Sequence, residues 1–410
     1  MTETKRVWPR KPYAAMVLKA SMSLELIDAR ADRERVRVLW TQLTAEGAPS
    51  YFLSWSWIEN WLDMLPPHVH VEMACFREGG QPALGCLLTR SRFARQGIFR
   101  GRKLAVHETG DWNYDCLYME YNGFVGRTES AKDIMTMLRS LPSPWDEIDF
   151  SGMDMDGFPG QKLLDEAAAG PFEVIVMQER DAHFINLEAV RAKKDYLALL
   201  SSNTRSQIRR SERMYAEAHG PVKVEVARDL TGARDIYEEM LVLHQRSWEL
   251  REEESMFVQP WIQQFHARLI SERFDSGEIQ MVRIKAGDYT IGCLYNYVYQ
   301  GRVYFYQGGL VHEYDNKLKP GMVSHAAAIQ HCAGLGLAEY DFLAGAEQYK
   351  ERMGTDRRRL VWARVQRPLL RFKVEKLARR VAKDVLVRWE DWKKQRASNV
   401  SSAQPQEASS

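Results

Sequence analysis

The residues between Leu310 and the helix that begins at Pro320-Gly321 have the character of an anion-binding loop. A predicted strand ends near Leu310, the loop after it carries Lys317 and Lys319, and an apolar helical segment follows over 322–336. The first N–H groups of a helix have no partner within the helix, and the helix dipole makes this end electropositive. A glycine-containing loop at such a point suits a pyrophosphate or a similar anion.

We therefore expect the backbone N–H groups of Gly321, Met322 and Val323 to contact a phosphate-bearing ligand, with Lys317 and Lys319 beside it. A simpler interpretation is that Pro-Gly only begins a helix, because proline is well tolerated in the first helical turn. The order of strand, loop and helix favours the binding site.

Two carboxylates near the end of the next predicted strand, Asp341 and Glu347, are candidates for a general base. Asp341 alternates with the apolar residues Tyr340 and Phe342, so its side chain lies on the opposite face of the sheet. A carboxylate beside a cleft can have a raised pKa, which suits a base. The alternative is a structural carboxylate with satisfied hydrogen bonds, and for Asp341 we favour this alternative.

Four arginines occur close together in a predicted helix that follows Ser201. Arg205, Arg209 and Arg213 are spaced four residues apart, so they form one basic stripe, and Arg210 lies beside it. Such a stripe can bind the phosphate of a donor, tRNA or an anionic acceptor. A solvated basic face is the alternative.

A polar and aromatic cluster occurs in the first half of the chain, in a long predicted loop that includes Asp111, Trp112 and Tyr114. Mixed acidic, amide and aromatic side chains in a loop suit the recognition of a sugar or a peptide, although such clusters also occur in ordinary turns. We expect this cluster to lie on the acceptor side of the site.

Three short segments occur twice in the chain, in the same order. Such a pattern suggests a duplicated α/β unit. We predict two units, over 20–185 and 186–365, each with a mixed and mostly antiparallel sheet flanked by helices. The matching segments are Ala83–Leu87 with Thr290–Leu294, Gly101–Lys103 with Gly301–Val303, and Glu147–Phe150 with Glu339–Phe342.

A basic amphipathic helix is predicted over 366–396, and a polar, disordered tail over 397–410. The apolar residues of this helix are spaced to form one stripe among many lysines and arginines. The stripe could dock onto the two units or lie on an anionic membrane surface, and we expect docking. The apolar residues are Leu370, Val374, Leu377, Val381 and Val385.

The bulk composition is that of an ordinary globular protein, with 45% hydrophobic residues and a net charge of +2. This charge does not call for DNA or a membrane as a partner, so any electrostatic function must come from local patches. The five cysteines form no CxxC pair, which favours reduced thiols in the cytoplasm and no metal site. No apolar run is long enough to span a bilayer.

From Ser201 to Gly354 the chain resembles the CelD/BcsL-type acetyltransferases, a branch of the GNAT superfamily related to the FemAB aminoacyl-transferases. The residues over 49–61, PSYFLSWSWIENW, resemble the N-terminal region of this family. The resemblance extends to about residue 365. No single segment is specific for the family, but the segments taken together are. Its pieces are SSNTRSQIRRSER, LHQRSW, YFYQGGL, LKPG and YDFLAGAEQYKERMG.

The resemblance implies tandem GNAT-like domains that move an acyl group, above all from acetyl-CoA, to an amine or a hydroxyl. It implies that Lys350 stabilises charge near the transferring carbonyl group, and Tyr349 could protonate the leaving thiolate. A solvated helix start is the alternative for both residues. We place Trp248, from the matching LHQRSW piece, with Asp111, Trp112 and Tyr114 among the substrate-binding residues.

These observations predict a cytoplasmic acyltransferase with a small-molecule or saccharide acceptor, which the resemblance associates with polysaccharide or cell-envelope biosynthesis. Peripheral contact with the inner membrane face, through the basic helix, is part of this hypothesis. One alternative is a FemAB-like transferase that uses aminoacyl-tRNA, which the arginine stripe favours. Another is a non-catalytic scaffold within a polysaccharide-producing complex.

Overall fold

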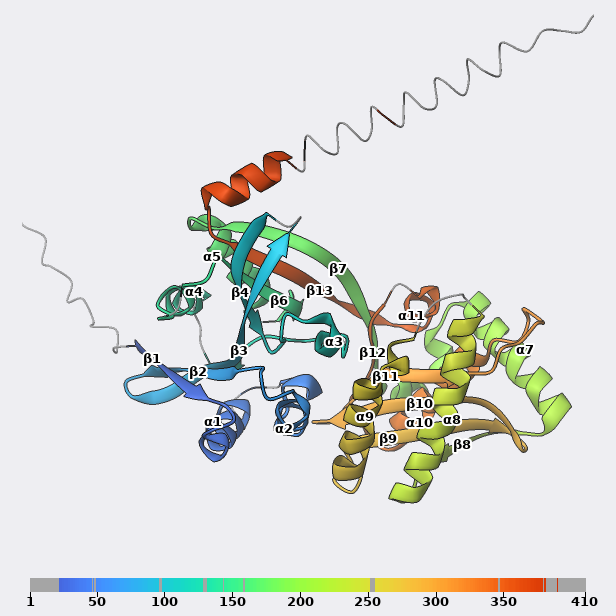
Figure 1. The fold of residues 1–410 in the computed structure, drawn as a ribbon. Coiled ribbons are helices and arrows are strands. Elements are labelled where there is room, and N and C mark those ends of the chain that lie inside the picture. Colours follow the sequence, from blue (N-terminus) through green and yellow to red (C-terminus); the bar gives the residue numbers. More distant parts are fainter. Residues whose placement is uncertain are drawn as a thin grey trace, which may run out of the picture.

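The computed structural model describes residues 22–380 and residue 389, apart from positions 46, 48, 96–97, 128–130, 143, 158, 251–254, 346 and 379. Within these residues the chain forms one mixed sheet of 13 strands, with helices on its faces (Figure 1). No helix in this part of the chain is long and apolar enough to cross a membrane. The predicted tail over 397–410 lies outside the described residues.

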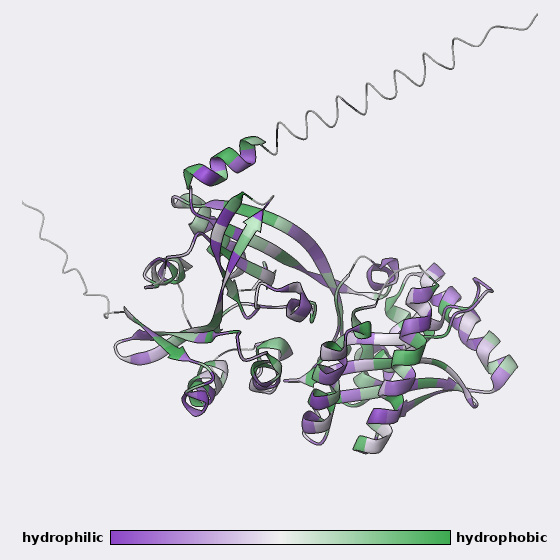
Figure 2. Ribbon diagram, viewed as in Figure 1, coloured by the Kyte–Doolittle hydropathy of each residue, from purple (hydrophilic) through white to green (hydrophobic). Residues whose placement is uncertain are grey.

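The first half of the molecule, residues 22–186, places two helices on one face of its strands and two on the other. Its hydrophobic residues lie mainly on the strands and on the helix faces that point toward them (Figure 2). The elements are β1 (Met22–Asp28), α1 (Arg33–Ala45), η1 (Tyr51–Leu53), α2 (Trp55–Met64), β2 (Val71–Glu78), β3 (Gln81–Arg95), β4 (Phe99–Val106), α3 (Trp112–Asp115), β5 (Val125–Gly126), α4 (Ala131–Arg139), β6 (Glu147–Asp154), α5 (Gly160–Ala169) and β7 (Glu173–Asn186).

The second half, residues 187–366, has a similar order of elements. Helices α8 and α9 pack on one face of its strands, and α7 and α10 pack on the other. The elements are α6 (Leu187–Lys193), η2 (Tyr196–Leu199), α7 (Ser202–His219), β8 (Val222–Val226), α8 (Leu230–Glu249), η3 (Met256–Val258), α9 (Pro260–Arg273), β9 (Ile279–Ala286), β10 (Tyr289–Tyr299), β11 (Arg302–Leu310), α10 (Pro320–Gly334), β12 (Glu339–Ala344), α11 (Gln348–Met353) and β13 (Asp356–Gln366).

The repeated sequence segments fall on equivalent strands. In the first half, β4 pairs in parallel with β6 over 103–105 and 147–149. In the second half, β11 pairs in parallel with β12 over 302–304 and 339–341. In both halves this pairing covers three residues of each strand, so the two strands then separate and leave a gap. Two similar mixed α/β units, as predicted from the sequence, are therefore present.

The last strand of the chain, β13, crosses into the first half and lies between β6 and β7. Strand β7 pairs along its length with β13, and its C-terminal end also pairs with β12 of the second half. The division into two domains at residues 185 and 186 stays a prediction, because the sheet continues through this point. The strand β13 supplies one arginine to each half: Arg364 pairs with Glu147 and Asp149, and Arg358 pairs with Glu339 and Asp341.

An aromatic cluster joins the two halves on the face that carries α2 and α9. Tyr51 of the first half stacks on Tyr297 of the second, with the ring centroids 4.4 Å apart. Trp57 lies edge-on to Phe265, with the centroids 5.0 Å apart. Aromatic contacts of this size contribute strongly to packing, so they hold the facing surfaces of the two halves in one arrangement.

The C-terminal helix, described over residues 370–378, docks onto the first half through one face. Phe372 stacks on Phe93, and the Glu375 carboxylate lies 2.9 Å from the Arg95 guanidinium. The expectation that the apolar stripe docks is therefore wrong for these residues, because an aromatic and a paired carboxylate on the opposite face make the contact. The stripe is instead exposed, Leu370 by 79%, Val374 by 56% and Leu377 by 62%. Val381 and Val385 lie outside the described residues.

Candidate functional site

The gap between β11 and β12 lies beside an irregularity in the sheet. The register between β10 and β11 shifts at this point, so Tyr306 is an extra residue on β11. A bulge of this kind leaves a residue unpaired, bends the strand and turns its backbone groups in a new direction. The pairing of β3 with β4 in the first half runs without a shift. The gap of the second half is therefore the one with a specialised backbone.

The corresponding gap between β4 and β6 in the first half is filled by the chain itself. The Asn122 backbone N–H donates to the Gly152 carbonyl at 3.2 Å, and its side-chain amide donates to the Val106 carbonyl at 2.8 Å. Its side-chain oxygen lies 2.6 Å from Nδ1 of the buried His107. Asn122 thus bridges both strands, and a ligand cannot occupy the same space. We refer to residues 119–123 as the plug.

A cavity of about 280 Å³ opens at the N-terminus of α10. The Lys319 N–H donates to Ser211 Oγ at 2.8 Å, which fixes this loop against α7. Among the described residues, nothing accepts from the N–H groups of Gly321 and Met322, so both are available to a ligand. Its lining includes Gln207, Lys319, Gly321, Met322, Tyr349 and Arg352.

Val323 does not suit the role predicted for it. Its N–H donates to the Lys319 carbonyl at 3.0 Å, as the first internal bond of the helix. This correction follows from the helix beginning at Pro320, which leaves only the two residues after the proline with unpaired N–H groups.

Two cations line the cavity, and only one of them was predicted. Lys319 lines it, whereas Lys317 does not. Arg352 of α11 also lines the cavity, and its guanidinium donates to Gln348 Oε1 at 3.3 Å. The sequence reasoning missed Arg352, although it lies within the segment YDFLAGAEQYKERMG that carries the family resemblance.

The arginine stripe of α7 lies away from this cavity. Arg205 and Arg209 do not line it, and Arg209 pairs with Asp195 at 3.1 Å. Gln207 and Ser211 occupy the face of α7 that points toward α10. Residues two positions apart in a helix point about 200° apart, so this face excludes the neighbouring arginines. Their predicted role toward the ligand stays a prediction.

If the acetyl-CoA expected from the sequence binds in this cavity, replacing Arg352 with glutamine should weaken its binding by about tenfold, because a charge-assisted hydrogen bond to phosphate contributes about that much. Isothermal titration calorimetry would measure the change. The matched control is Arg209→Gln, which removes the same charge outside the cavity and should leave the affinity unchanged. An equal loss of affinity in Arg209→Gln would indicate that the phosphates of acetyl-CoA contact α7 instead.

Tyr349 lies between the cavity and the gap. Its ring stacks on His325 with the centroids 5.3 Å apart, and it lies edge-on to Phe342. Burial lowers the pKa of His325 to about 3, so this imidazole is neutral at physiological pH. Tyr349 therefore has a fixed ring position on α11, close to where a ligand would leave the cavity and enter the gap.

Lys350 is buried beneath the end of β12. Its ammonium donates to the Ala344 carbonyl at 2.9 Å and lies 3.5 Å from the Glu347 carboxylate. A Cβ at Gly345 would lie 2.4 Å from Nζ of Lys350, so the glycine makes room for this ammonium. The arrangement fixes a positive charge at the turn where β12 leaves the gap.

The plug brings a carboxylate that the sequence reasoning did not consider. Glu120 accepts a hydrogen bond from the Ala344 N–H at 2.6 Å and is almost fully buried. Burial raises its pKa to about 8, although the Ala344 N–H and the Lys350 ammonium oppose this rise. A carboxyl group with a pKa near the working pH is well suited to act as a general base. Glu120 and Ala344 are 224 positions apart, so no local pattern indicates their contact.

Asp341 is also buried, but its oxygens are occupied. Tyr121 donates to it at 2.5 Å, the Leu343 N–H donates at 2.7 Å, and Arg358 approaches at 3.4 Å. Burial raises its pKa to about 6. Asp149 holds the equivalent position in the first half and pairs with the other arginine of β13. Asp341 thus repeats a structural arrangement that also occurs beside the filled gap.

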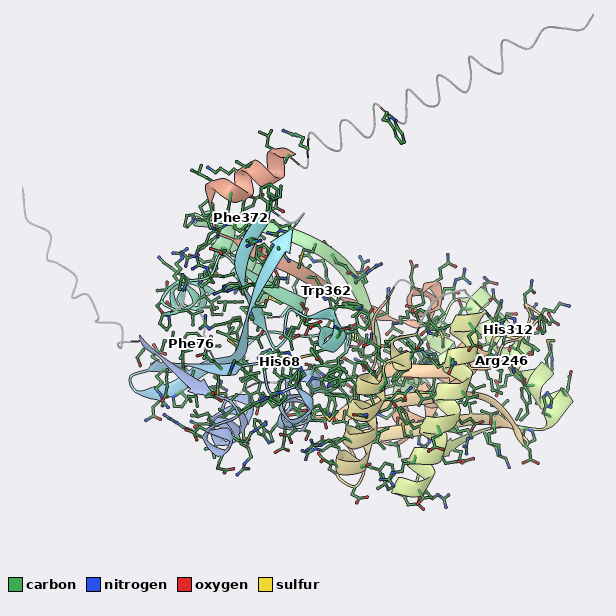
Figure 3. The ribbon with its side chains drawn as sticks, viewed as in Figure 1. His68, Phe76, Arg246, His312, Trp362 and Phe372 are labelled. Atoms are coloured by element: carbon green, nitrogen blue, oxygen red, sulfur yellow. The ribbon has the colours of Figure 1, made fainter. Side chains whose placement is uncertain are left out.

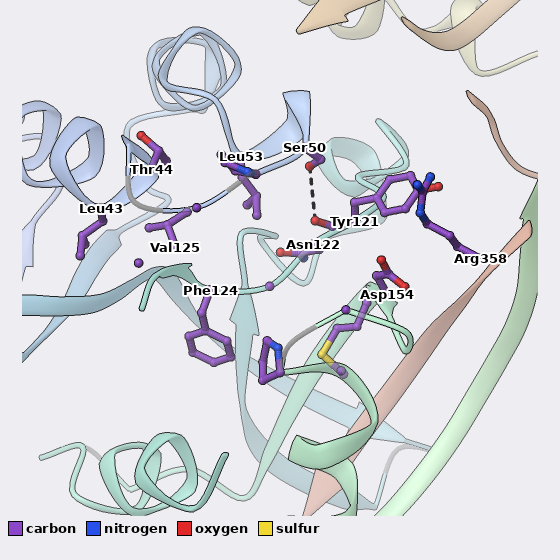
Figure 4. Close-up of a pocket in the computed structure, with 18 of the residues that line it drawn as sticks. Leu43, Thr44, Ser50, Leu53, Tyr121, Asn122, Phe124, Val125, Asp154 and Arg358 are labelled. Carbon is purple, nitrogen blue, oxygen red and sulfur yellow. Dashed lines mark hydrogen bonds between the residues drawn. The ribbon is translucent and has the colours of Figure 1, made fainter. Parts of the chain in front are cut away.

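A second cavity, of about 470 Å³, lies between the two halves (Figure 4). It reaches the plug through Tyr121 and Asn122, and it reaches the second half through Asp341 and Arg358. It touches β11 and β12 at Arg302, Tyr304 and Asp341, within the segment where these two strands are still paired. Asp111, Trp112, Tyr114 and Trp248, which we predicted to bind substrate, do not line it.

The predicted substrate residues have other contacts. Asp111 caps α3 by accepting from the Asn113 N–H at 3.0 Å, and Trp112 on this short helix is exposed. Tyr114 packs edge-on against Trp261 of α9, with the centroids 5.2 Å apart. Trp248 packs beside His244. The segment from Asp111 to Tyr114 thus supports the approach of the plug to the second half, and its role toward a substrate stays a prediction.

Residues 202–351 match the family described as an acetyltransferase (GNAT) domain. The match spans the α10 cavity, the gap and the Tyr349-Lys350 pair. The second half is therefore similar to a GNAT acetyltransferase domain, and proteins of this superfamily typically use acyl-CoA as donor. No curated protein matches the chain significantly.

Solved structures with a similar fold include that of FemX, at 10% sequence identity and a TM-score of 0.55. The similarity covers 86% of this chain and 99% of FemX. Another is the C-terminal domain (DUF2156) of a putative lysylphosphatidylglycerol synthetase from Agrobacterium fabrum, at 12% identity, 82% and 93% coverage and a TM-score of 0.48. A third is a tandem GNAT protein from the clavulanic acid biosynthesis pathway, at 12% identity, 83% and 98% coverage and a TM-score of 0.42. The predicted mixed α/β fold is confirmed, with one long mixed sheet and an overall fold similar to that of FemX.

Proposed function

We propose that this protein transfers an acetyl or another acyl group from an acyl-CoA to an amine or a hydroxyl. The observation that carries the proposal is the placement of Glu120 and Tyr349 near the gap between β11 and β12, beside a helix N-terminus with two unpaired N–H groups. The filled gap of the first half supports a single donor site per chain.

The donor binds at the N-terminus of α10. Its pyrophosphate accepts from the N–H groups of Gly321 and Met322, while Lys319 and Arg352 neutralise its charge. The thioester end then reaches the gap between β11 and β12. Free N–H groups and fixed cations need no rearrangement to meet the anion, which favours tight binding.

The reaction is a direct attack within a ternary complex. The acceptor nitrogen or oxygen attacks the thioester carbonyl, and Glu120, in its ionised form, takes the proton that the acceptor loses. The Lys350 ammonium stabilises the negative charge that forms on the carbonyl oxygen. When the carbon–sulfur bond breaks, Tyr349 protonates the departing CoA thiolate.

The acceptor enters through the cavity between the halves. Arg302 at its wall suits an acceptor that also carries an anionic group, whereas Arg358 is already paired with Glu339 and Asp341. The size of about 470 Å³ suits a small molecule or one or two sugar rings. The resemblance to the CelD/BcsL type supports a place in polysaccharide or cell-envelope biosynthesis, in the cytoplasm.

Calorimetric titration of the purified full chain with acetyl-CoA tests the proposal. Saturable binding, followed by acceptor-dependent release of free CoA thiol, is the expected result. A folded protein that binds no acyl-CoA would contradict the proposal. A titration with aminoacyl-tRNA would then decide between the FemAB-like transferase and the non-catalytic scaffold.

Replacing Tyr349 with phenylalanine should slow acyl transfer by about 100-fold, because the leaving thiolate loses its proton donor. Phenylalanine keeps the ring that stacks on His325, so acetyl-CoA should bind as before. The measurement is the rate of CoA thiol release at saturating donor. An unchanged rate would show that water, and not Tyr349, protonates the thiolate.

A further inference from the structure

The C-terminal helix over 370–378 and the tip of the β3–β4 hairpin lie together at one end of the first half (Figure 1). Phe372, on the side of the helix that faces the sheet (Figure 3), stacks on Phe93 of β3 with the centroids 6.3 Å apart. The Arg95 guanidinium lies over the same Phe372 ring at 5.6 Å. The two elements therefore form one continuous surface.

The outward face of this helix is apolar. Leu370, Val374 and Leu377 follow helical spacing, so they lie in one stripe about half a turn away from Phe372. A docked helix normally buries its apolar stripe, whereas this one buries Phe372 and Glu375 and turns the stripe outward. The sequence continues the spacing at Val381 and Val385. An exposed apolar stripe of this kind marks a surface that another body covers.

Lysine and arginine flank the stripe. Lys373 and Arg380 lie along one side of it, and Arg371 lies along the other. The acidic groups near the helix are already paired: Glu375 with Arg95, Asp146 with Arg102 and Arg371, and Glu173 with Lys376. Lys373 and Arg380 make no ion pair with any residue in the described part of the chain. Positive charge therefore exceeds negative charge along the stripe.

The hairpin tip adds a second apolar and basic element. Ile98, at the turn, is 73% exposed. Arg92 lies directly opposite Arg102 across the strands. Arg100 shares their face of the hairpin, which is the face opposite Phe93 and the helix, so these arginines flank the tip on its other side. Asp146 pairs with Arg102 and so offsets the repulsion between these two facing arginines. Arg92 and Arg100 have no ion pair within the described residues.

We propose that this surface, made of the 370–378 helix and the β3–β4 tip, binds an anionic lipid membrane. Aliphatic side chains that project outward beside lysine and arginine match the interfacial region of a bilayer, where the apolar groups enter and the cations reach the phosphates. Nucleic acid would meet the cations but would leave four aliphatic side chains in water. The proposal does not depend on acyl transfer.

Flotation of the full chain with lipid vesicles tests this proposal. We expect binding to phosphatidylcholine vesicles that contain phosphatidylglycerol, and little binding to phosphatidylcholine alone. The combined variant Leu370→Asp, Val374→Asp and Leu377→Asp should lower the vesicle partition coefficient by at least about tenfold. The variant Arg92→Gln with Arg100→Gln should lower it by about fivefold for each arginine at low salt, and by less at high salt.

The matched control carries three aspartates at exposed apolar positions elsewhere, Val242→Asp (67% exposed), Val258→Asp (52%) and Leu335→Asp (58%). This variant should bind vesicles almost as the wild type does, because its charge change is identical but lies away from the stripe. Equal loss in both triple variants, equal binding to neutral vesicles, or no flotation of the wild type would overturn the proposal. A wild-type dimer that the stripe variant abolishes in sedimentation would show that a second copy covers the stripe instead.

Discussion

Replacing Glu120 with glutamine should slow acyl transfer by about 1,000-fold, while acetyl-CoA binds as before. Glutamine keeps an oxygen that can accept from the Ala344 N–H, so the plug should stay in place. The amide cannot take the proton that the acceptor must lose, and this is the reason for the large effect. The rate of CoA thiol release at saturating donor, with the donor affinity measured separately, checks the prediction.

The pH dependence gives a second readout of the same residue. Burial raises the pKa of Glu120 to about 8, and a base must be ionised to act. The wild-type kcat/KM should therefore rise with pH and level off above about 8, and this rise should be absent from the remaining activity of Glu120→Gln.

The sign of the stability effect follows from the same raised pKa. As pH rises from the ordinary carboxyl range near 4 toward 8, the unfolded chain loses its proton before the folded one does. The contribution of Glu120 to the free energy of unfolding is thus present at low pH and lost as pH rises through about 8. Chemical denaturation at several pH values should show this loss in the wild type and a smaller one in Glu120→Gln.

The control for both measurements is Glu347→Gln. Glu347 is an exposed carboxylate that contacts the Lys350 ammonium, and it is the base that we predicted from the sequence. Its replacement should change the rate by less than tenfold. If Glu347→Gln abolishes transfer and Glu120→Gln does not, the base is Glu347 and our assignment is wrong.

Those parts of the site that depend on local order could be predicted from the sequence. The strand, loop and helix that form the α10 cavity follow one another directly, so spacing alone places Gly321 and Met322 at a helix N-terminus. The two-unit fold was also predictable, because three short matches mark equivalent strands. Such reasoning cannot tell which way a helix face points. The sequence shows that Arg205 and Arg209 share one face of a helix, but the packing of the helix decides what this face is turned toward.

The remaining features depend on contacts between distant residues. Glu120 contacts Ala344 because the plug, which fills the gap between β4 and β6, also reaches β12 of the second half. The position of β13 between β6 and β7 of the first half follows from the pairing of whole strands, and no sequence motif indicates it. The C-terminal helix has two faces that could dock, and Phe93 decides between them by offering an aromatic partner to Phe372.

Replacing Gly321 with tryptophan should abolish measurable acetyl-CoA binding, a loss of at least about 100-fold in affinity. A Cβ at this position would already lie 3.1 Å from the Leu310 side chain, so the indole has to turn toward the cavity of about 280 Å³ at the helix N-terminus. It would then cover the N–H groups that are available to the pyrophosphate. Titration calorimetry measures the loss, and acyl transfer should fall with it.

The same helix provides the control, Gly334→Trp. A Cβ at Gly334 has no neighbour within 4 Å, and this residue is at the opposite end of α10 from the cavity. The control should therefore bind acetyl-CoA with wild-type affinity, and the melting temperatures of both variants show whether they fold. If the folded Gly321→Trp protein binds acetyl-CoA normally, the donor does not use the N-terminus of α10. If it loses binding while Gly334→Trp keeps it, the loss reflects the blocked cavity and not the added bulk, because the two variants carry the same side chain on the same helix.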